Sequence, residues 1–290
     1  MTNFDTLVSQ VISQNAEYPA LRTVIEKELL HYDILRAMSG AGFLKNLTFM
    51  GGTCLRDCHG SQRLSEDLDF TGGFEFSKSD MAELGEVIQK SIEKKYALPV
   101  IVTEPTKERH ESANTETWKI KVITRPERPD FPALFATKFP AQKINIVICM
   151  LPSRERKVSM LKNPYGIDMG TDGVLLYAES LSEILCDKVI AFARRPNRVK
   201  NRDLWDIHWL SQKNVSLKKD LLLQKLDDRK IAEVDFWEQY KARCGQIKAG
   251  QKDFLFEMRR FLAPSAFSEQ FVSAMWWEYL CNLLGEYMTA

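Results

Sequence analysis

The sequence lacks the features of a membrane protein or of a protein that coats nucleic acid. Its 40 Lys and Arg residues nearly balance 39 Asp and Glu residues, so the formal net charge is only +1. Global charge of this size does not hold nucleic acid, so any such contact must be local. No segment reaches the roughly 18 consecutive apolar residues of a membrane span. Even the apolar stretch 271–284 is interrupted by Glu278 and Asn282.

Secretion signals and a disulfide framework are also missing. The N-terminus MTNFDTLVSQ has neither the basic start nor the apolar run of a signal peptide, and the six cysteines are scattered. These absences predict a protein of the reducing cytoplasm. Cys54, Cys58 and His59 lack a second Cys or His pair nearby, so we expect no structural zinc.

Apolar periodicity divides the 290 residues into a mixed half and a helical half. Strand-like runs are predicted at 47–50, 68–70, 99–104, 116–124 and 143–150, and helices over 21–38 and 81–96. From about residue 178 helical patterns dominate: 177–195, 202–212 and four further candidates, the last over 268–288. We expect domains at 1–165 and 166–290 that pack with a cleft between them.

Residues 49–70 contain the most informative pattern. A predicted strand ends at Gly51 and Gly52, and Thr53 begins a helix, an arrangement that can cradle phosphate oxygens. Asp67 and Asp69 then alternate on a strand, so both carboxylates face one side and could share Mg²⁺. Taken singly, the glycines are more often a simple turn and the aspartates a solvated strand end.

A second pattern is a basic stretch between Asp187 and Asp203. It carries Lys188, Arg194, Arg195, Arg198, Lys200 and Arg202 without an acidic residue, which suits phosphate binding. Asp203 and Asp206 share one face at the start of the next predicted helix. The alternative is a solvated basic loop with Asp203 at a helix start.

The order of strand, Gly-Gly-Thr, helix and Asp-x-Asp strand resembles the DNA polymerase β-like nucleotidyltransferase superfamily. More narrowly, GGTCLRDCHGSQRLSEDLDF is similar to the AbiEii family, the toxin component of type IV toxin–antitoxin systems. Arg56 and the pattern over 63–69 narrow the resemblance, which continues through 181–210 and covers roughly 45–210.

The resemblance implies an α/β (α+β) nucleotidyltransferase-like domain with a central mixed sheet, followed by a mostly helical C-terminal bundle that completes the active-site cleft. It implies transfer of a nucleoside monophosphate from a nucleoside triphosphate to an acceptor, and RNA, above all tRNA, is the favoured acceptor. The expected cofactor is Mg²⁺ or Mn²⁺. The protein is expected to be a bacteriostatic toxin with a cognate antitoxin and a role in phage defence. No membrane partner is expected. Asp67 and Asp69 would hold the metal, and Lys188, Asp203 and Asp206 would complete catalysis. Nucleotide binding would fall to Gly51, Gly52, Thr53, Arg56, Ser65, Lys143, Asp187 and Arg202.

One departure from the family pattern concerns the strand over 143–150. Related enzymes add an acid there, whereas this strand contains none and has Asn145 on the same side as Lys143. An amide cannot supply a negative charge or act as a base. Either Asp203 or Asp206 replaces that acid, or catalysis is weakened. The missing acid leaves open a silent homologue that binds nucleotide, RNA or antitoxin. A small-molecule nucleotidyltransferase also stays open, because the same donor machinery serves small acceptors.

Several other residues are predicted to be structural. Trp205, Trp209, Trp276 and Trp277 lie at helical spacing among apolar residues, which favours core packing over base stacking. His208 between Ile207 and Trp209 is expected to be structural as well. The segment 125–130 is predicted to be an exposed loop.

Overall fold

The computed structural model describes residues 2–105, 114–125, 140–267 and 269–288. Of the loop predicted at 125–130, all but Arg125 lies outside the described residues. The chain forms two compact units, Met1–Ala178 and Glu179–Ala290. This division confirms a mixed first half and a helical second half.

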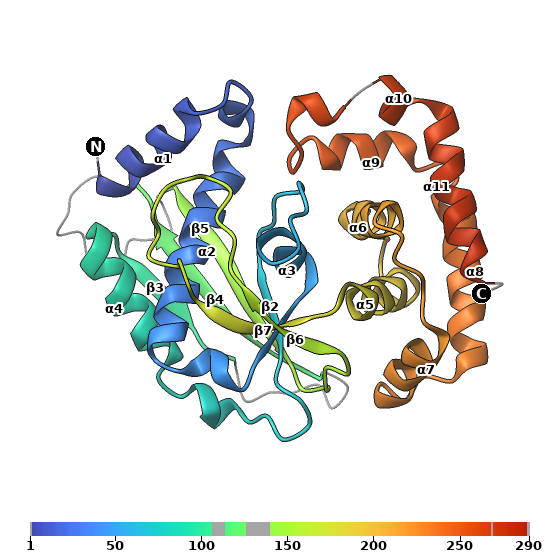
Figure 1. The fold of residues 1–290 in the computed structure, drawn as a ribbon, viewed down its shortest axis with the longest axis horizontal. Helices are drawn as coiled ribbons and strands as arrows, with labels where there is room; N and C mark the ends of the chain where they lie inside the picture. Colours follow the sequence, from blue (N-terminus) through green and yellow to red (C-terminus); the bar gives the residue numbers. More distant parts are fainter. Residues whose placement is uncertain (1, 106–113, 126–139, 268, 289–290) are drawn as a thin grey trace. The chain divides into compact units, whose positions relative to one another are not determined.

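The first unit contains a seven-stranded mixed sheet in the order β3-β4-β5-β2-β1-β7-β6 (Figure 1). Its strands are β1 (Thr48–Met50), β2 (Leu68–Thr71), β3 (Val100–Thr103), β4 (Thr115–Ile123), β5 (Ala141–Cys149), β6 (Arg156–Met160) and β7 (Leu175–Glu179). Its helices are α1 (Asn3–Ser13), α2 (Arg22–Gly40), α3 (Gly51–Asp57) and α4 (Leu84–Tyr96), with short 3₁₀ turns at Tyr18–Leu21, Phe43–Lys45 and Lys78–Met81. The five predicted strands are confirmed.

The domain boundary lies later in the chain than the sequence suggested. Strand β7 pairs in parallel with β1, through Thr48 with Tyr177 and Phe49 with Ala178. Residues 166–178 therefore belong to the first unit, and the expected boundary at 165/166 is corrected to 178/179. The strand was hidden because its apolar residues run directly into the helical pattern that follows.

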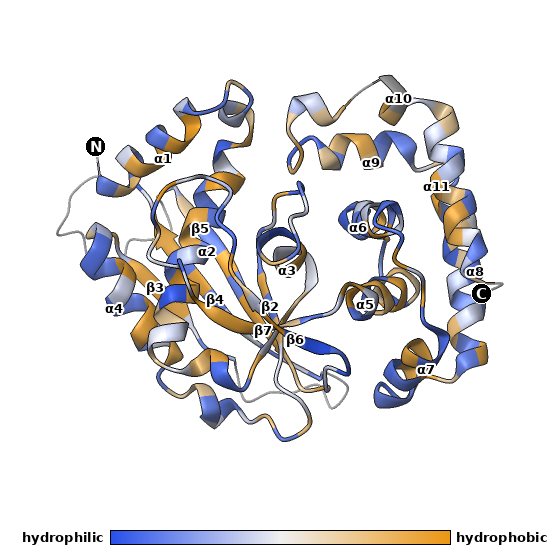
Figure 2. Cartoon of the chain, viewed as in Figure 1, coloured by the Kyte–Doolittle hydropathy of each residue, from blue (hydrophilic) through white to orange (hydrophobic). Residues whose placement is uncertain are grey.

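The two faces of the sheet differ in what they carry. On β5, Ile144, Ile146 and Ile148 are fully buried, and Gln142 on the same side donates to Glu26 of α2. Helices α2 and α4 pack against each other on this side, and Figure 2 shows the apolar character of the strands beneath them. Because strand residues alternate in direction, the odd-numbered residues of β5 point to the opposite face.

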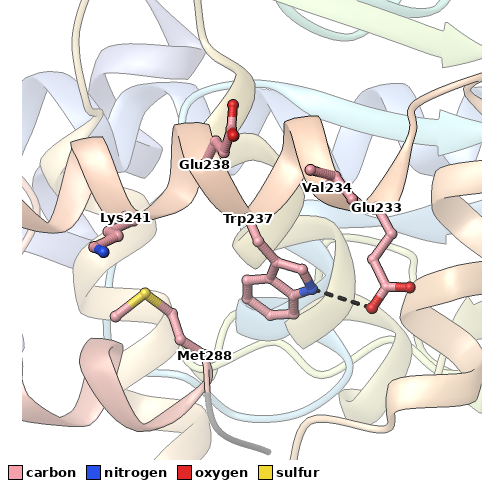
Figure 3. A pocket seen from close by; sticks show the side chains of 6 residues that line it. All are labelled: Glu233, Val234, Trp237, Glu238, Lys241 and Met288. Atoms are coloured by element: carbon pink, nitrogen blue, oxygen red, sulfur yellow. Dashed lines mark hydrogen bonds between the residues drawn. The ribbon is translucent and has the colours of Figure 1, made fainter.

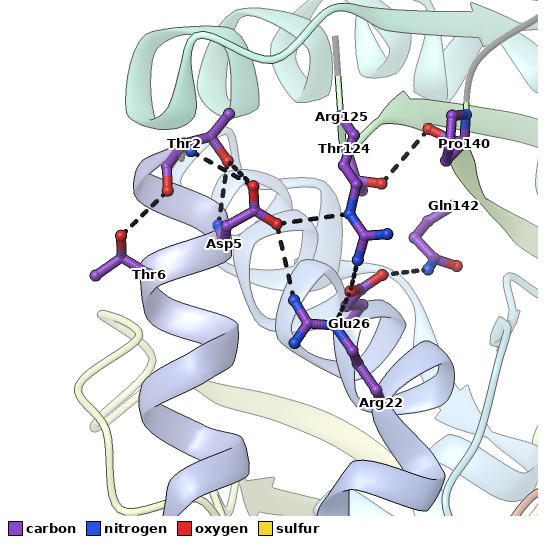
Figure 4. A network of polar contacts seen from close by, with 9 residues as sticks. All are labelled: Thr2, Asp5, Thr6, Arg22, Glu26, Thr124, Arg125, Pro140 and Gln142. Carbon is purple, nitrogen blue, oxygen red and sulfur yellow. Dashed lines mark hydrogen bonds and ion pairs between the residues drawn. The ribbon is translucent and has the colours of Figure 1, made fainter. Parts of the chain in front are cut away.

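A polar network ties the ends of β4 and β5 to the N-terminal helices (Figure 4). Glu26 on α2 accepts from Gln142 at 2.7 Å, from Arg22 at 3.0 Å and from Arg125 at 3.4 Å. Arg22 and Arg125 each also reach Asp5 of α1 at 3.8 Å. Since Gln142 is the second residue of β5, the network fixes the strand that carries Asn145.

The second unit is a helical bundle. It consists of α5 (Leu181–Arg194), α6 (Asn201–Gln212), α7 (Lys219–Asp228), α8 (Glu233–Ile247), α9 (Gln251–Met258), α10 (Glu269–Val272) and α11 (Ala274–Glu286), with a 3₁₀ turn at Pro264–Ala266. The last predicted helix is interrupted at Ser273, whose side chain caps α11 by accepting from the Trp276 N–H. Within the described part of the chain, no helix has the length and apolar character needed to cross a membrane.

Four tryptophans of this unit belong to its core, as predicted. Trp205, Trp209, Trp276 and Trp277 are all buried. The His208 ring packs edge-on against Trp276, with ring centroids 5.0 Å apart, and burial lowers its pKa to about 4. The ring is therefore neutral near pH 7, which confirms a structural histidine.

Replacement of His208 by Phe should make the protein less sensitive to acid. Between pH 6.5 and 4 the unfolded chain protonates His208 while the folded protein does not, so stability falls as the pH falls. We expect the wild type to lose on the order of 2 kcal/mol more than His208→Phe over this range. Urea denaturation at several pH values measures the difference, and equal losses in both proteins would contradict the assignment.

Candidate active site

The Gly51-Gly52 turn connects β1 directly to α3 and lies against two side chains. Gly51 has φ of +74°, and a Cβ placed there would lie 2.8 Å from Asp69 Oδ2. A Cβ on Gly52 would lie 2.2 Å from Nη2 of the buried Arg63. Glycine is therefore required at both positions, first for its backbone angle and second for the close approach of Asp69 and Arg63.

Thr53 holds the polypeptide that leads into β2. Its side chain is fully buried, and its hydroxyl donates to the backbone carbonyl of Asp67. The sequence pattern indicated a phosphate contact for this hydroxyl. In the structure the hydroxyl instead fixes the position of Asp67 relative to the start of α3.

Asp67 and Asp69 lie on the sheet face opposite to α2, beside Asn145. Strands β2 and β5 are parallel, with Leu68 opposite Ile146 and Asp69 opposite Val147. Oδ1 of Asp67 accepts from the backbone N of Asn145 at 3.1 Å and from its Nδ2 at 3.0 Å. Asn145 therefore faces Asp67 from β5 and orients the Asp67 side chain.

The two carboxylates have the chemistry of a magnesium site. Both side chains are partly exposed, and both offer oxygen donors. No group of three or more His, Cys, Asp or Glu residues suited to a metal occurs among the residues that the structure describes. Mg²⁺ is commonly bound by one or two carboxylates together with waters and substrate phosphates, so the donor set at Asp67 and Asp69 fits this ion.

Arg56 and Ser65 both bind a buried acid, Glu28 of α2. Arg56 Nε donates to Glu28 Oε2 at 3.1 Å, and the backbone N of Ser65 donates to Oε1 at 2.9 Å. The Tyr165 hydroxyl also donates to Glu28, and Arg56 further donates to the carbonyl of Ser61 at 3.3 Å. With its side chain only 11% exposed, Arg56 holds the loop that precedes Asp67.

Sequence reasoning did not single out Glu28. Its signal was its position on the apolar stripe of α2, between Ile25 and Tyr32 at helical spacing, where an acidic residue is unusual. A buried carboxylate needs hydrogen-bond or charged partners, and here they come from Arg56, Ser65 and Tyr165. Glu28 is thus a positioning residue for the segment that ends at Asp67.

In the second unit, Lys188 of α5 lies between the two aspartates of α6. Its Nζ is 2.8 Å from Asp203 Oδ1 and 2.7 Å from Asp206 Oδ2. Arg195 Nε is 2.8 Å from Asp203 Oδ2. Burial alone would raise the pKa of Asp203, but the two cations outweigh it and lower the pKa to about 2. The structure therefore brings the predicted residues Lys188, Asp203 and Asp206 together in one cluster.

Asp187 and Arg202 lie apart from that cluster. Asp187 carboxylate oxygens lie 2.8 Å from Lys225 Nζ on α7 and 2.8 Å from Arg229 Nη2. Asp187 has different partners from Lys188 because adjacent residues on a helix point in different directions. Lys225 also contacts Glu183 at 2.9 Å. Arg202 lies over the Phe261 ring, 4.8 Å from its centroid. These contacts of Asp187 and Arg202 are internal to the helical unit.

An open pocket of about 590 Å³ lies along α8 (Figure 3). Its lining consists of Glu233, Val234, Trp237, Glu238, Lys241 and Met288. None of the predicted site residues contributes to it. Two of its charged side chains are acidic and would repel phosphates, so the pocket is a poor nucleotide site.

Comparison with solved structures identifies the fold. The chain is similar to MenT4, a nucleotidyltransferase toxin from Mycobacterium tuberculosis H37Rv, at 16% identity and a TM-score of 0.56, over 98% of this chain and 89% of that one. It is also similar to JHP933 from Helicobacter pylori, at 16% identity and a TM-score of 0.48, over 92% and 93% of the two chains. A comparison with curated proteins found no match.

The likeness to MenT4 shows a nucleotidyltransferase fold. The family model described as nucleotidyl transferase AbiEii toxin, type IV toxin–antitoxin system, matches residues 33–275. The chain therefore belongs to the AbiEii family and is a nucleotidyltransferase, which confirms the resemblance seen in residues 49–70 and 181–210.

Proposed function

We propose that the protein transfers a nucleoside monophosphate from a nucleoside triphosphate to a hydroxyl of RNA, with tRNA as the leading acceptor. The acceptor oxygen bonds to the α-phosphorus and its proton passes to solvent, the bond between the α-phosphorus and the oxygen bridging to the β-phosphate breaks, and pyrophosphate leaves. The observation that carries the proposal is the pair Asp67 and Asp69, held against Gly51 and Asn145 in a nucleotidyltransferase fold.

The residues of the first unit would prepare the donor. Asp67 and Asp69 would hold Mg²⁺ or Mn²⁺, which when bound neutralises charge on the reacting phosphates. Asn145 orients Asp67, and Thr53 fixes the backbone of the same residue. Glu28 and Arg56 would act through the loop rather than on the nucleotide.

The helical unit would contribute one cation, Lys188, to stabilise negative charge on the triphosphate. Asp203 and Asp206 would position this ammonium group rather than deprotonate the acceptor. An Asp203 carboxylate with a pKa near 2 is a weak base, and Asp206 is fully buried against Lys188. This proposal replaces the expectation that Asp203 or Asp206 takes the place of the acid missing from the strand over 143–150.

The proposed biological role follows from the family. AbiEii proteins are toxins of toxin–antitoxin systems, so a nucleotide substrate and an antitoxin partner are implied. We propose that the protein arrests growth by modifying RNA in the cytoplasm, in the context of phage defence. A silent homologue is the second candidate, and it is favoured by one observation: the side chain that reaches Asp67 from β5 is the amide of Asn145, on a strand without an acid.

The decisive experiment is a transfer assay with purified protein, Mg²⁺, total bacterial tRNA and each of the four α-labelled ribonucleoside triphosphates in turn. We expect label on RNA with the wild type and none with Asp67→Asn. Label on a small hydroxyl compound but not on RNA would favour a small-molecule acceptor. Folded wild-type protein that binds nucleotide but transfers to neither acceptor would support the silent homologue.

Gly51→Ala should strongly impair transfer, with Gly60→Ala as a matched control. Gly60 has a similar φ of +80°, but a Cβ there would meet nothing within 4 Å. Both variants should lose about 1–2 kcal/mol of stability from the left-handed backbone. Only Gly51→Ala displaces Asp69, and displacement of about 1 Å can cost roughly a hundredfold in rate. Equal transfer rates in the two variants would contradict the role given to Gly51.

A further inference from the structure

Three lysines lie in a row on the sheet face that carries Asp67 and Asp69. Strands β4 and β5 are antiparallel, with Lys119 opposite Asn145 and Lys121 opposite Lys143. All four residues share the face opposite to α2, because the alternate residues of both strands are buried in the core. Lys119 and Lys143 are exposed, and Lys121 is partly buried. We call Lys119, Lys121 and Lys143 the lysine row.

The lysine row and the Gly51-Gly52 turn lie on opposite sides of the carboxylate pair. The sheet order places β1 on one side of β2, and β5 and then β4 on the other. Asp69 approaches Gly51, which follows β1, whereas Asp67 is hydrogen-bonded to Asn145 of β5. Strand β5, which carries Lys143, is adjacent to β2, and strand β4, which carries Lys119 and Lys121, is two strand spacings from β2, or about 10 Å. The row therefore lies beside the carboxylate pair.

We infer that the lysine row binds backbone phosphates of the acceptor RNA. The inference rests on the proposed function and assigns one side of the site to each substrate. In an in-line displacement, the attacking hydroxyl and the departing pyrophosphate lie on opposite sides of the α-phosphorus. The RNA strand that carries the attacking hydroxyl must therefore extend from the carboxylate pair on the side opposite to the pyrophosphate.

The chemistry of the lysine row and of the Gly51-Gly52 turn indicates which side binds RNA and which binds pyrophosphate. The lysine row spreads separate point charges over two strands, which suits a chain of repeated phosphates better than one compact pyrophosphate. Such contacts position an RNA strand without reading its sequence. The glycine side, where backbone approaches Asp69 without an intervening Cβ, suits the compact group. Lys143, predicted to bind nucleotide, is thereby assigned to RNA.

The test measures RNA binding and nucleotide use separately. Lys119→Gln and Lys143→Gln are compared with Lys94→Gln, an exposed lysine on α4, which packs against the other sheet face. The dissociation constant for total bacterial tRNA is measured without nucleotide at several salt concentrations. KM for the triphosphate is measured in the transfer assay, and melting temperatures report on folding.

We expect each row variant to bind tRNA about tenfold more weakly, with a salt dependence reduced by about 0.7 in the log–log slope. KM for the triphosphate and all properties of Lys94→Gln should stay unchanged. A raised KM with unchanged tRNA binding would overturn the inference in favour of a triphosphate site, and no change in either would also overturn it. Because binding is measured without transfer, an inactive wild type would refute the proposed function while the binding data still judge the lysine row.

Discussion

Asp67→Asn should abolish nucleotidyl transfer without lowering the melting temperature. Asparagine retains an oxygen that can accept the two hydrogen bonds from Asn145, so the local structure is kept. It loses the negative charge that a hard cation requires from its ligands. We expect the rate to fall by at least about a thousandfold, measured as label transferred to RNA at saturating Mg²⁺.

The matched control is Asp172→Asn, an exposed aspartate of the same unit. It removes the same charge from the protein and should retain full transfer. In bacterial cells, expression of the wild type and Asp172→Asn should arrest growth, and expression of Asp67→Asn should not. Full activity of purified Asp67→Asn would remove Asp67 from the metal site, and arrest by an inactive variant would show that toxicity does not require transfer.

The parts of the site that could be predicted are those encoded in short segments. The glycine turn and the alternating aspartates depend on local spacing, and the structure places the turn between β1 and α3, Asp69 on β2 and Asp67 directly before it. Strand periodicity fixes which side chains share a face, so the sequence alone assigns Asp67 and Asp69 to one face.

The contacts that depend on distant packing could not be predicted. Arg56 and Ser65 looked like nucleotide ligands because they lie within the family motif, but their partner Glu28 is 28 and 37 residues away in sequence. Likewise, the absence of an acid in β5 was visible, yet the pairing of Asn145 with Asp67 depends on parallel strand register. Register between distant strands is set by the assembled core rather than by either strand alone.

Lys188 combines a structural and a proposed catalytic role, which must be separated by experiment. Its side chain is only 12% exposed, and it neutralises two buried carboxylates. Lys188→Met leaves Asp206 without this cation, so the free energy of unfolding should fall by about 3–5 kcal/mol. A loss of transfer in this variant alone could then reflect partial unfolding.

Lys225→Met provides the matched control for that cost. Lys225 is also buried, on α7, and bridges Glu183 and Asp187 without a proposed role in transfer. Below both melting temperatures, we expect Lys225→Met to retain transfer and Lys188→Met to lose at least about a hundredfold. If both variants lose transfer in proportion to their loss of stability, the function of Lys188 is structural. If only Lys188→Met is inactive while folded, the ammonium group acts on the substrate, since the acids around it have lost no more support than those around Lys225.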